Sequence, residues 1–287
     1  MKDVAIFDTT LRDGALSDGV SFSKDDKTAI ASALAALGVN VIEVATAGKD
    51  PMADVLSLSR DVRDSTLCVL AVASHDAIDW AGEALLGAAS ARIHVYQAAS
   101  AEPDAVARTE DAVRRARNLA AEVEFSPANG ARAPLDAVVA VTRAALLGGA
   151  TTISFADTVG RALPEEIAGR LRDLFGRVPE LEGACVSFHG HDDLGLATAN
   201  SLAAVQSGAR QLEVAVNGLG ARAGNAALEE VAAAIDVHGL TLGARTSIRL
   251  EGLPELSRVV EARSGLAVAA QKAIVGRNAR WFRGERI

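Results

Sequence analysis

The sequence has few cysteines and aromatic residues and no long uninterrupted apolar run. Only two cysteines, Cys68 and Cys185, occur in 287 residues, and each lies in a valine-containing run typical of a buried strand. A disulfide framework or a thiolate metal site is therefore not expected, and a reducing, cytoplasmic location is predicted. No apolar run reaches the roughly 18 residues of a membrane span, and no signal-peptide pattern follows Met1, so neither membrane insertion nor export is expected.

The chain also lacks an excess of basic charge. It contains 29 Lys and Arg against 37 Asp and Glu, a formal net charge of −8, and only 3% aromatic residues. This charge has the wrong sign for a polyphosphate backbone, and too few aromatic rings are present to stack bases, so nucleic-acid binding is not expected. Hydrophobic residues make up 49% of the chain, enough to form the core of a globular protein.

What the sequence does contain is a regular alternation of short β-branched runs with longer Ala/Leu/charged segments of helical spacing. Eight strands are predicted, at Val4–Phe7, Val39–Ala45, Leu67–Ala73, Arg92–Tyr96, Glu122–Phe125, Thr152–Phe155, Ala184–Phe188 and Gln211–Ala215. Eight helices are predicted, at Lys24–Leu37, Met52–Arg63, Asp76–Gly87, Pro103–Ala120, Pro134–Leu147, Pro164–Phe175, Leu196–Gln206 and Asn225–His238.

This alternation indicates an α/β protein with a parallel sheet covered by helices. Eight such units close a (β/α)8 TIM barrel, which we favour over an open doubly wound sheet because the open sheet usually has fewer strands and leaves its edges exposed. We assign residues 1–253 to the barrel as the catalytic domain, and residues 254–287 to a short C-terminal helical extension and a basic tail.

Polar residues follow most of the predicted strands. The carboxyl ends of the strands are the end of a TIM barrel at which active sites lie. His189 and His191 are two residues apart at the end of a strand, so their side chains point to the same side. With oxygen donors such as Asp13 and Asn225 they would form a mixed site suited to Mg²⁺, Mn²⁺, Fe²⁺, Co²⁺ or Zn²⁺. The alternative is a pair of surface or hydrogen-bonded histidines.

Two further features near the predicted mouth have two interpretations each. Arg12, beside Asp13, could stabilise a developing enolate oxygen or clamp a carboxylate, or it could form a structural ion pair. The glycines between Gly218 and Gly224 could bring backbone amides close to an anion, or simply allow a turn.

Taken together, these segments resemble the enzymes that condense acyl-CoA with 2-oxoacids: the 2-isopropylmalate, homocitrate and citramalate synthases of a metal-dependent barrel superfamily. Four segments carry the resemblance in order: Asp8-Thr-Thr-Leu-Arg-Asp-Gly14, Ala156-Asp-Thr-Val-Gly160, His189-Gly-His-Asp-Asp-Leu-Gly195 and Asn217-Gly-Leu-Gly-Ala-Arg-Ala-Gly-Asn-Ala226. A fifth segment, Lys272–Ala279, is also similar. The resemblance spans nearly the whole chain.

The resemblance implies one divalent metal ion (Mg²⁺, Mn²⁺ or Zn²⁺) that the 2-oxoacid chelates. The implied ligands are Asp13, His189, His191 and Asn225. The implied activity is that of an acyltransferase of amino-acid biosynthesis, with acetyl-CoA or a similar acyl-CoA as co-substrate. Its product would be a 2-alkylmalate-type acid such as isopropylmalate or homocitrate.

Further roles follow from the same resemblance. Arg12 would bind the ketone oxygen as it becomes an alkoxide, Thr158 and Arg132 would hold the substrate carboxylate, and Glu43 would be an acid of the pocket. A base must remove a proton from the acetyl methyl group. Glu43 and His75 are the residues of the predicted mouth that could do so.

A second interpretation is a metal-dependent C–C lyase or aldolase, such as 3-hydroxy-3-methylglutaryl-CoA lyase or 4-hydroxy-2-oxovalerate aldolase. It gains support because the segment Gly218–Asn225, with Ala221 where the synthases commonly have glutamate, looks somewhat aldolase-like. Ala128-Asn129 also departs from the glutamate-aspartate pair of the synthases. However, no cysteine lies between Asn217 and Asn225, as the lyase requires, and no histidine directly follows Gly14, as the aldolase requires. Condensation is therefore favoured.

A third interpretation is a barrel subunit that needs a second chain for activity. Members of the resembling family continue past the match at Lys272–Ala279 into a histidine-containing segment and helical subdomains, whereas this sequence ends at Ile287. We therefore expect small-molecule substrates together with a homodimer or a complex with a second subunit, and no leucine-type feedback domain. The adjacent Trp281 and Phe282 are a candidate interface anchor, with a frayed terminus as the alternative.

Overall fold

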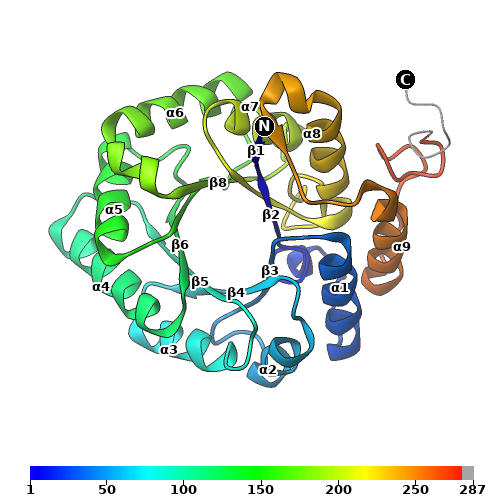
Figure 1. Cartoon of the computed structure of the whole chain (residues 1–287), viewed down its shortest axis with the longest axis horizontal. Helices are drawn as coiled ribbons and strands as arrows, with labels where there is room; N and C mark the ends of the chain where they lie inside the picture. The colour runs from blue at the N-terminus through cyan, green and yellow to red at the C-terminus, as the bar shows by residue number, and fades with distance from the viewer. Residues whose placement is uncertain (280–287) are drawn as a thin grey trace.

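Eight parallel strands close into a barrel in the computed structural model, which describes residues 1–279. Each strand pairs with the next along the chain, and β9 closes the barrel against β2 (Figure 1). The barrel strands are β2 (Ala5–Asp8), β3 (Val41–Thr46), β4 (Thr66–Val72), β5 (Ala91–Ala98), β6 (Glu122–Ala128), β7 (Thr152–Asp157), β8 (Cys185–Gly190) and β9 (Gln211–Val214). The predicted (β/α)8 barrel is confirmed.

Helices α1 to α8 surround the barrel in a ring, and α9 lies outside the ring against α1 (Figure 1). They are α1 (Lys24–Leu37), α2 (Met52–Asp61), α3 (His75–Ala84), α4 (Pro103–Leu119), α5 (Leu135–Gly148), α6 (Pro164–Arg177), α7 (Ala197–Gln206), α8 (Leu228–Leu242) and α9 (Leu253–Ser264). Short 3-10 turns lie at η1 (Gly14–Leu16), η2 (Pro179–Gly183), η3 (Val216–Gly218) and η4 (Leu250–Gly252). None of the helices within residues 1–279 is long and apolar enough to cross a bilayer.

The two faces of the barrel strands carry different kinds of side chain. Alternate apolar residues such as Ile93 and Phe125 are fully buried in the main hydrophobic core that the helices cover. On β5 and β6 the residues between them are polar, and Arg92 of β5 reaches Gln211 of β9 at 2.7 Å. Phe7, Val41 and Cys68 form a small buried apolar cluster separate from the main core. Because β5 and β9 are not neighbours, the contact between Arg92 and Gln211 crosses the inside of the barrel. The interior is therefore largely polar, and the apolar core lies between the sheet and the helices.

Three details differ from the sequence-based prediction or add to it. The helix expected from Asn225 begins at Leu228, because Asn225 is held in a backbone bridge with His191. A two-stranded sheet, β1 (Lys2–Asp3) with β10 (Ala244–Arg245), was not predicted. The boundary predicted after residue 253 falls at the start of α9, whose Leu256 and Val260 join the main core. The candidate anchor at Trp281 and Phe282 lies outside the described residues.

Candidate metal centre and the polar network around it

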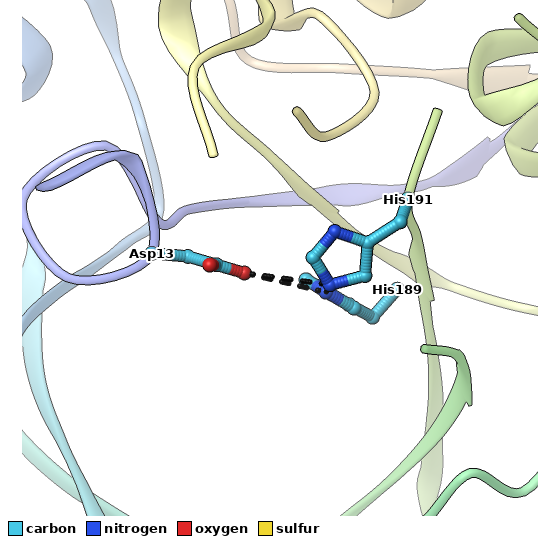
Figure 2. Close-up of side chains that lie close together, drawn as sticks. All are labelled: Asp13, His189 and His191. Carbon is cyan, nitrogen blue, oxygen red and sulfur yellow. Dashed lines mark hydrogen bonds and ion pairs between the residues drawn. The ribbon is translucent and has the colours of Figure 1, made fainter. Parts of the chain in front are cut away.

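Three buried side chains from two segments converge at the carboxyl ends of the strands. His189 lies on β8, His191 follows that strand, and Asp13 lies in the turn after β2. The Nε2 atoms of the histidines are 3.1 Å apart, and Asp13 Oδ2 lies 3.6 Å from His189 Nε2 and 3.7 Å from His191 Nε2 (Figure 2). One metal ion could contact all three atoms with small side-chain adjustments.

The turn after β2 places Asp13 by means of a compact set of hydrogen bonds. The carbonyl oxygen of Thr9 accepts the N–H groups of Arg12, Asp13 and Gly14 at 2.8–3.1 Å. Upstream, the Asp8 carboxylate accepts both the N–H and the hydroxyl of Thr10. These hydrogen bonds fix the backbone of the turn from which the Asp13 side chain extends toward the histidines.

The protonation of these groups suits a cation. Burial and the nearby His189 lower the pKa of His191 to about 4, so its ring is neutral at pH 7. Burial alone would raise the pKa of Asp13, but Arg12 and the two histidines outweigh it and lower the net pKa. His191 Nδ1 is buried without a hydrogen-bond partner. A neutral imidazole, an ionised carboxylate and a second imidazole match the donor set of a divalent metal site, so the residues present fit such an ion.

Asn225, the fourth predicted ligand, lies against the same cluster. Its Nδ2 donates to Asp13 Oδ2 at 3.2 Å and to Thr9 Oγ1 at 2.9 Å, while its Oδ1 is buried without a partner. An amide nitrogen does not bind a cation, but a 180° rotation of the amide group would turn the oxygen toward Asp13. The structure thus places Asn225 beside Asp13 with its amide nitrogen toward the carboxylate, and its role as a metal ligand stays a prediction.

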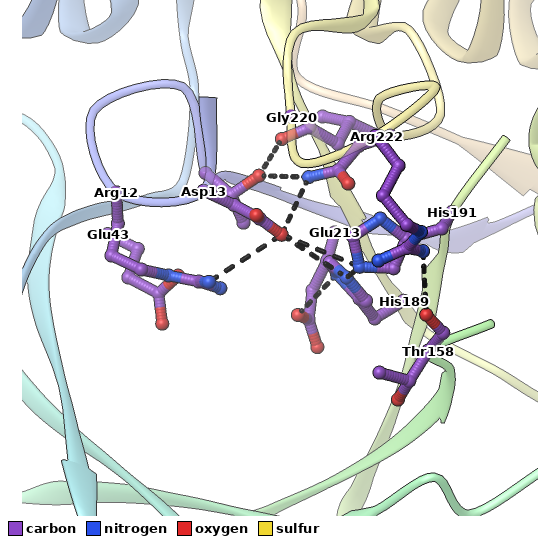
Figure 3. A network of polar contacts seen from close by, with 12 residues as sticks. Arg12, Asp13, Glu43, Thr158, His189, His191, Glu213, Gly220 and Arg222 are labelled. Carbon is purple, nitrogen blue, oxygen red and sulfur yellow. Dashed lines mark hydrogen bonds and ion pairs between the residues drawn. The ribbon is translucent and has the colours of Figure 1, made fainter. Parts of the chain in front are cut away.

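Arg12 is held beside the cluster by a chain of buried side chains. Its Nε donates to Glu43 Oε2 at 2.5 Å, and its Nη1 lies 3.5 Å from Asp13 Oδ2. Glu43 Oε1 lies 3.0 Å from His94 Nδ1, and His94 Nε2 lies 2.7 Å from Ser126 Oγ. Figure 3 shows Arg12 approaching Asp13 from the side of Glu43, with the histidines on the other side. The guanidinium therefore has a fixed orientation next to the candidate metal centre.

His94 and Glu213 belong to this network, although the sequence analysis did not single them out. Glu213, on β9, is 2% exposed, and its Oε2 lies 3.1 Å from Nδ1 of His189. Its Oε1 accepts the hydroxyls of Ser154 and Ser187. Both residues stand in strands between apolar neighbours. That period-two placement of polar residues is the signal that could have identified them.

Three predicted site residues are not part of this buried network. His75 begins α3, is 55% exposed and pairs with Asp111 of α4 at 2.6 Å, so it lies in the outer helical layer and not in the polar interior. Arg132 is exposed and lines a cavity beside α6. Thr158 is exposed next to the cluster, where its carbonyl oxygen accepts a hydrogen bond from Arg222 Nη2 at 2.8 Å (Figure 3).

The chain is similar to known proteins over most of its length. The family model described as HMGL-like matches residues 3–260. The 2-isopropylmalate synthases of Nitrosococcus oceani and Hydrogenovibrio crunogenus are 44% and 45% identical over 97% of this chain. The alignments cover 57% and 56% of those relatives, so the chain spans little more than half of their length.

Solved structures share the fold at lower identity. HMG-CoA lyase from Brucella melitensis superposes with a TM-score of 0.76 at 22% identity, covering 92% of this chain and 100% of that chain. The carboxyl transferase domain of Rhizobium etli pyruvate carboxylase has a TM-score of 0.72 at 18% identity, covering 92% of this chain and 48% of that chain. At these identities the likeness concerns the barrel and not the reaction.

Proposed function

The chain belongs to the HMGL-like family, and from this premise we propose that it is an acyltransferase that condenses acetyl-CoA, or a similar acyl-CoA, with a 2-oxoacid. The observation that carries the proposal is the convergence of Asp13, His189 and His191 beside the fixed guanidinium of Arg12. Relatives named 2-isopropylmalate synthase support the reaction class. A 2-alkylmalate-type acid, such as isopropylmalate or homocitrate, is the expected product.

We propose one divalent ion, Mg²⁺, Mn²⁺ or Zn²⁺, held by Asp13, His189 and His191, and by Asn225 after rotation of its amide. Such an ion, when bound, polarises a carbonyl group and orients the molecule that chelates it. The candidate ligands are imidazole and carboxylate groups, with no cysteine among them. Such ligands favour these ions over soft metals that prefer thiolate ligands.

The chain's own residues would stabilise and orient the reacting groups. Arg12 lies next to the metal cluster and would donate to the ketone oxygen of the 2-oxoacid as negative charge develops there; a donor of this kind contributes roughly 2.7–4 kcal/mol. Glu43 already accepts from Arg12 and contacts His94, so we propose that it orients Arg12. The hydroxyl of Thr158, at the edge of the cluster, is proposed to bind the substrate carboxylate.

The test is to incubate the metal-loaded protein with acetyl-CoA and a panel of 2-oxoacids while following the release of free thiol and identifying the products by mass spectrometry. We expect thiol release that requires one of the 2-oxoacids and is abolished in His189→Ala/His191→Ala. Asp61→Ala, at the exposed last residue of α2, is the control and should keep its activity. Cleavage of a hydroxyacyl-CoA or a 4-hydroxy-2-oxoacid without condensation would instead establish the lyase or aldolase interpretation.

We also propose that the protein works as a homodimer or with a second subunit. The support is an apolar patch on α8, where Leu240 is 90% exposed and Val237, one turn away, is 54% exposed. Light scattering of the purified protein should give a mass above the 29.5 kDa of one chain.

A cytoplasmic location is proposed because Cys68 and Cys185 are both free, as in reducing compartments.

A further inference from the structure

A cavity of about 460 Å³ lies outside the barrel, between the loop after β6 and the first turns of α6. Three arginines from three separate elements line it: Arg132 from the β6–α5 loop, Arg161 from the β7–α6 loop and Arg170 from α6. Glu166 and Asp173 line the same cavity. The arginines outnumber the acids here, whereas the whole chain has a net charge of −8.

The arginines of this cavity have unused donors. Arg132 and Arg161 are exposed and make no ion pair or side-chain hydrogen bond with any residue among 1–279. Arg170 is anchored, because its Nη2 donates to the carbonyl oxygens of Gly130 and Ala133, but its Nε is buried without a partner. Glu166 does not neutralise them, since its carboxylate accepts the N–H of Leu163 at the start of α6. Such a set of guanidinium donors is suited to an oxyanion.

The loop that carries Arg161 also contacts the metal-bearing segment. Its first residue, Thr158, accepts a hydrogen bond from Arg222, as Figure 3 shows beside His191. Gly160 accepts the N–H of Leu194, three residues after His191. The loop therefore separates the candidate metal centre on one side from the arginine-lined cavity on the other, at the same end of the barrel.

We propose that this cavity binds the phosphate groups of the coenzyme A portion of the acyl-CoA substrate. The inference rests on the proposed function, because only the acyl-CoA substrate carries phosphates. A 2-oxoacid has its carboxylate directly attached to its ketone carbon, so a carboxylate bound in this cavity would hold the ketone away from Arg12. This proposal assigns Arg132 to the nucleotide end of the acyl donor, which differs from the 2-oxoacid binding that the sequence resemblance implied.

Binding is tested by isothermal titration calorimetry with adenosine 3′,5′-bisphosphate, which reproduces the nucleotide end of coenzyme A. We expect Arg132→Gln/Arg161→Gln to weaken binding about tenfold or more, since each lost charge-assisted hydrogen bond has a large effect. Arg172→Gln is the matched control, because Arg172 lies on the same helix but lines a different cavity with Lys2 and Arg210. Equal binding to the wild type and the double variant would overturn the proposal.

Two further measurements identify the ligand. Inorganic phosphate that binds as tightly as the bisphosphate would show a general anion site and overturn the assignment to coenzyme A. In turnover, the double variant should raise the KM for acetyl-CoA but not for the 2-oxoacid, and should leave turnover of acetyl-pantetheine, which lacks the nucleotide, unchanged. An equal loss with acetyl-pantetheine would also contradict the proposal.

The calorimetric result is independent of the reaction. Loss of bisphosphate binding in the double variant supports the cavity even if no 2-oxoacid is condensed, and that failure would count against the proposed function alone. Condensation by a wild-type protein that shows no bisphosphate binding would count against the cavity alone.

Discussion

Among individual residues, Glu213 contacts a candidate metal ligand without being a ligand itself. Its Oε2 lies 3.1 Å from His189 Nδ1, and the ring is thereby oriented with Nε2 toward Asp13. We predict that Glu213→Gln weakens metal binding about 10–100-fold, the effect usual for a carboxylate that orients a histidine ligand. A titration with Mn²⁺ or Zn²⁺ measures this directly.

A matched control is Glu124→Gln. Glu124 is also a fully buried glutamate inside the barrel, but it accepts hydrogen bonds from Arg92 and Gln211 and contacts no candidate ligand. Its variant should keep the wild-type metal affinity. Similar losses in both variants would show that any buried charge change disturbs the site, and the specific role of Glu213 would be abandoned.

Asp8 gives a pH-dependent prediction. Burial raises the pKa of Asp8 from 3.8 to about 7, despite the two hydrogen bonds from Thr10. The unfolded chain therefore releases this proton near pH 4 and the folded chain near pH 7, so the free energy of unfolding falls between these values and stays lower above them.

Asp8→Asn removes the ionisation and keeps an acceptor for the N–H of Thr10. We expect this variant to be more stable than the wild type at pH 8, by about 2–4 kcal/mol, and to lose most of that advantage at pH 4. Calorimetric melting at the two pH values measures the difference. An advantage of the same size at both would mean that ionisation of Asp8 is not its cause.

How far single residues could be predicted depends on where they lie in the elements. His189 and His191 could be placed together from their two-residue spacing at a strand end, because the pleat fixes the side to which they point. Glu213 could not be paired with His189 from the sequence, since their contact depends on two strands packing side by side. His75 follows a strand, as the other candidates do, but its position as the first residue of α3 turns it toward α4.

Between elements, the packing of α4 against α5 depends on one small residue. A Cβ at Gly148 would lie 2.7 Å from the backbone oxygen of Glu110 and 2.9 Å from Cβ of Val113, both on α4. Gly148→Ala should therefore push the helices apart and cost about 1–3 kcal/mol of stability. Gly176→Ala, in α6 with nothing within 4 Å of its added Cβ, should be neutral or stabilising. Urea denaturation of the two variants tests the contrast, and equal effects would contradict it.

The loop between η3 and α8 is tied across the mouth by Arg222. This residue has a left-handed backbone, φ +58°, and its side chain bonds both carboxylate oxygens of Asp193 at 2.9 Å as well as the carbonyl of Thr158. Arg222→Gly relieves the backbone strain but removes the tie. We expect stability to change by less than about 1 kcal/mol, because the ion pair is largely exposed, while the amides of residues 217–225 exchange faster with solvent.

Hydrogen exchange followed by mass spectrometry makes this measurement. Arg258→Ala removes another exposed ion pair, with Glu255 on α9, and should leave exchange in residues 217–225 unchanged. Unaltered exchange in the Arg222 variant would show that the glycine turns alone hold the loop.

The order of the elements could be predicted almost completely, because apolar strands and capped helices alternate along the chain. Ser23 forms a capping box with Asp26 at the start of α1, and that helix has the predicted bounds. The start of α8 could not be predicted in the same way, because Asn225 forms a β-bridge with His191. His191 lies 34 residues earlier in the sequence, so no local pattern indicates this pairing. The pairing of β1 with β10 involves two residues on each side, too few for a periodic pattern.

For the whole molecule, the separation between an apolar core and a polar interior predicts that folding does not require the metal. The main core lies between sheet and helices, whereas the candidate ligands lie at the carboxyl ends of the strands. We expect the protein treated with a chelator to keep its circular dichroism spectrum. Metal at about 100 times its Kd should add about 2.7 kcal/mol of stability, which corresponds to roughly 5–10 °C in Tm.

The control for this prediction is His189→Ala/His191→Ala, whose Tm should not respond to added metal. Loss of secondary structure on chelation would contradict the prediction, as would an equal metal-induced shift in the double variant.

The pairing of β1 with β10 fixes residues 2–3 at the amino-terminal end of the barrel strands, whereas the candidate metal centre lies at their carboxyl ends. A protein immobilised on a solid support through a linker at Lys2 would therefore have the carboxyl ends of its barrel strands facing the solution. Dissolved ligands could then reach the immobilised protein as freely as they reach the protein in solution, and a surface-based sensor could detect their binding without obstruction from the support.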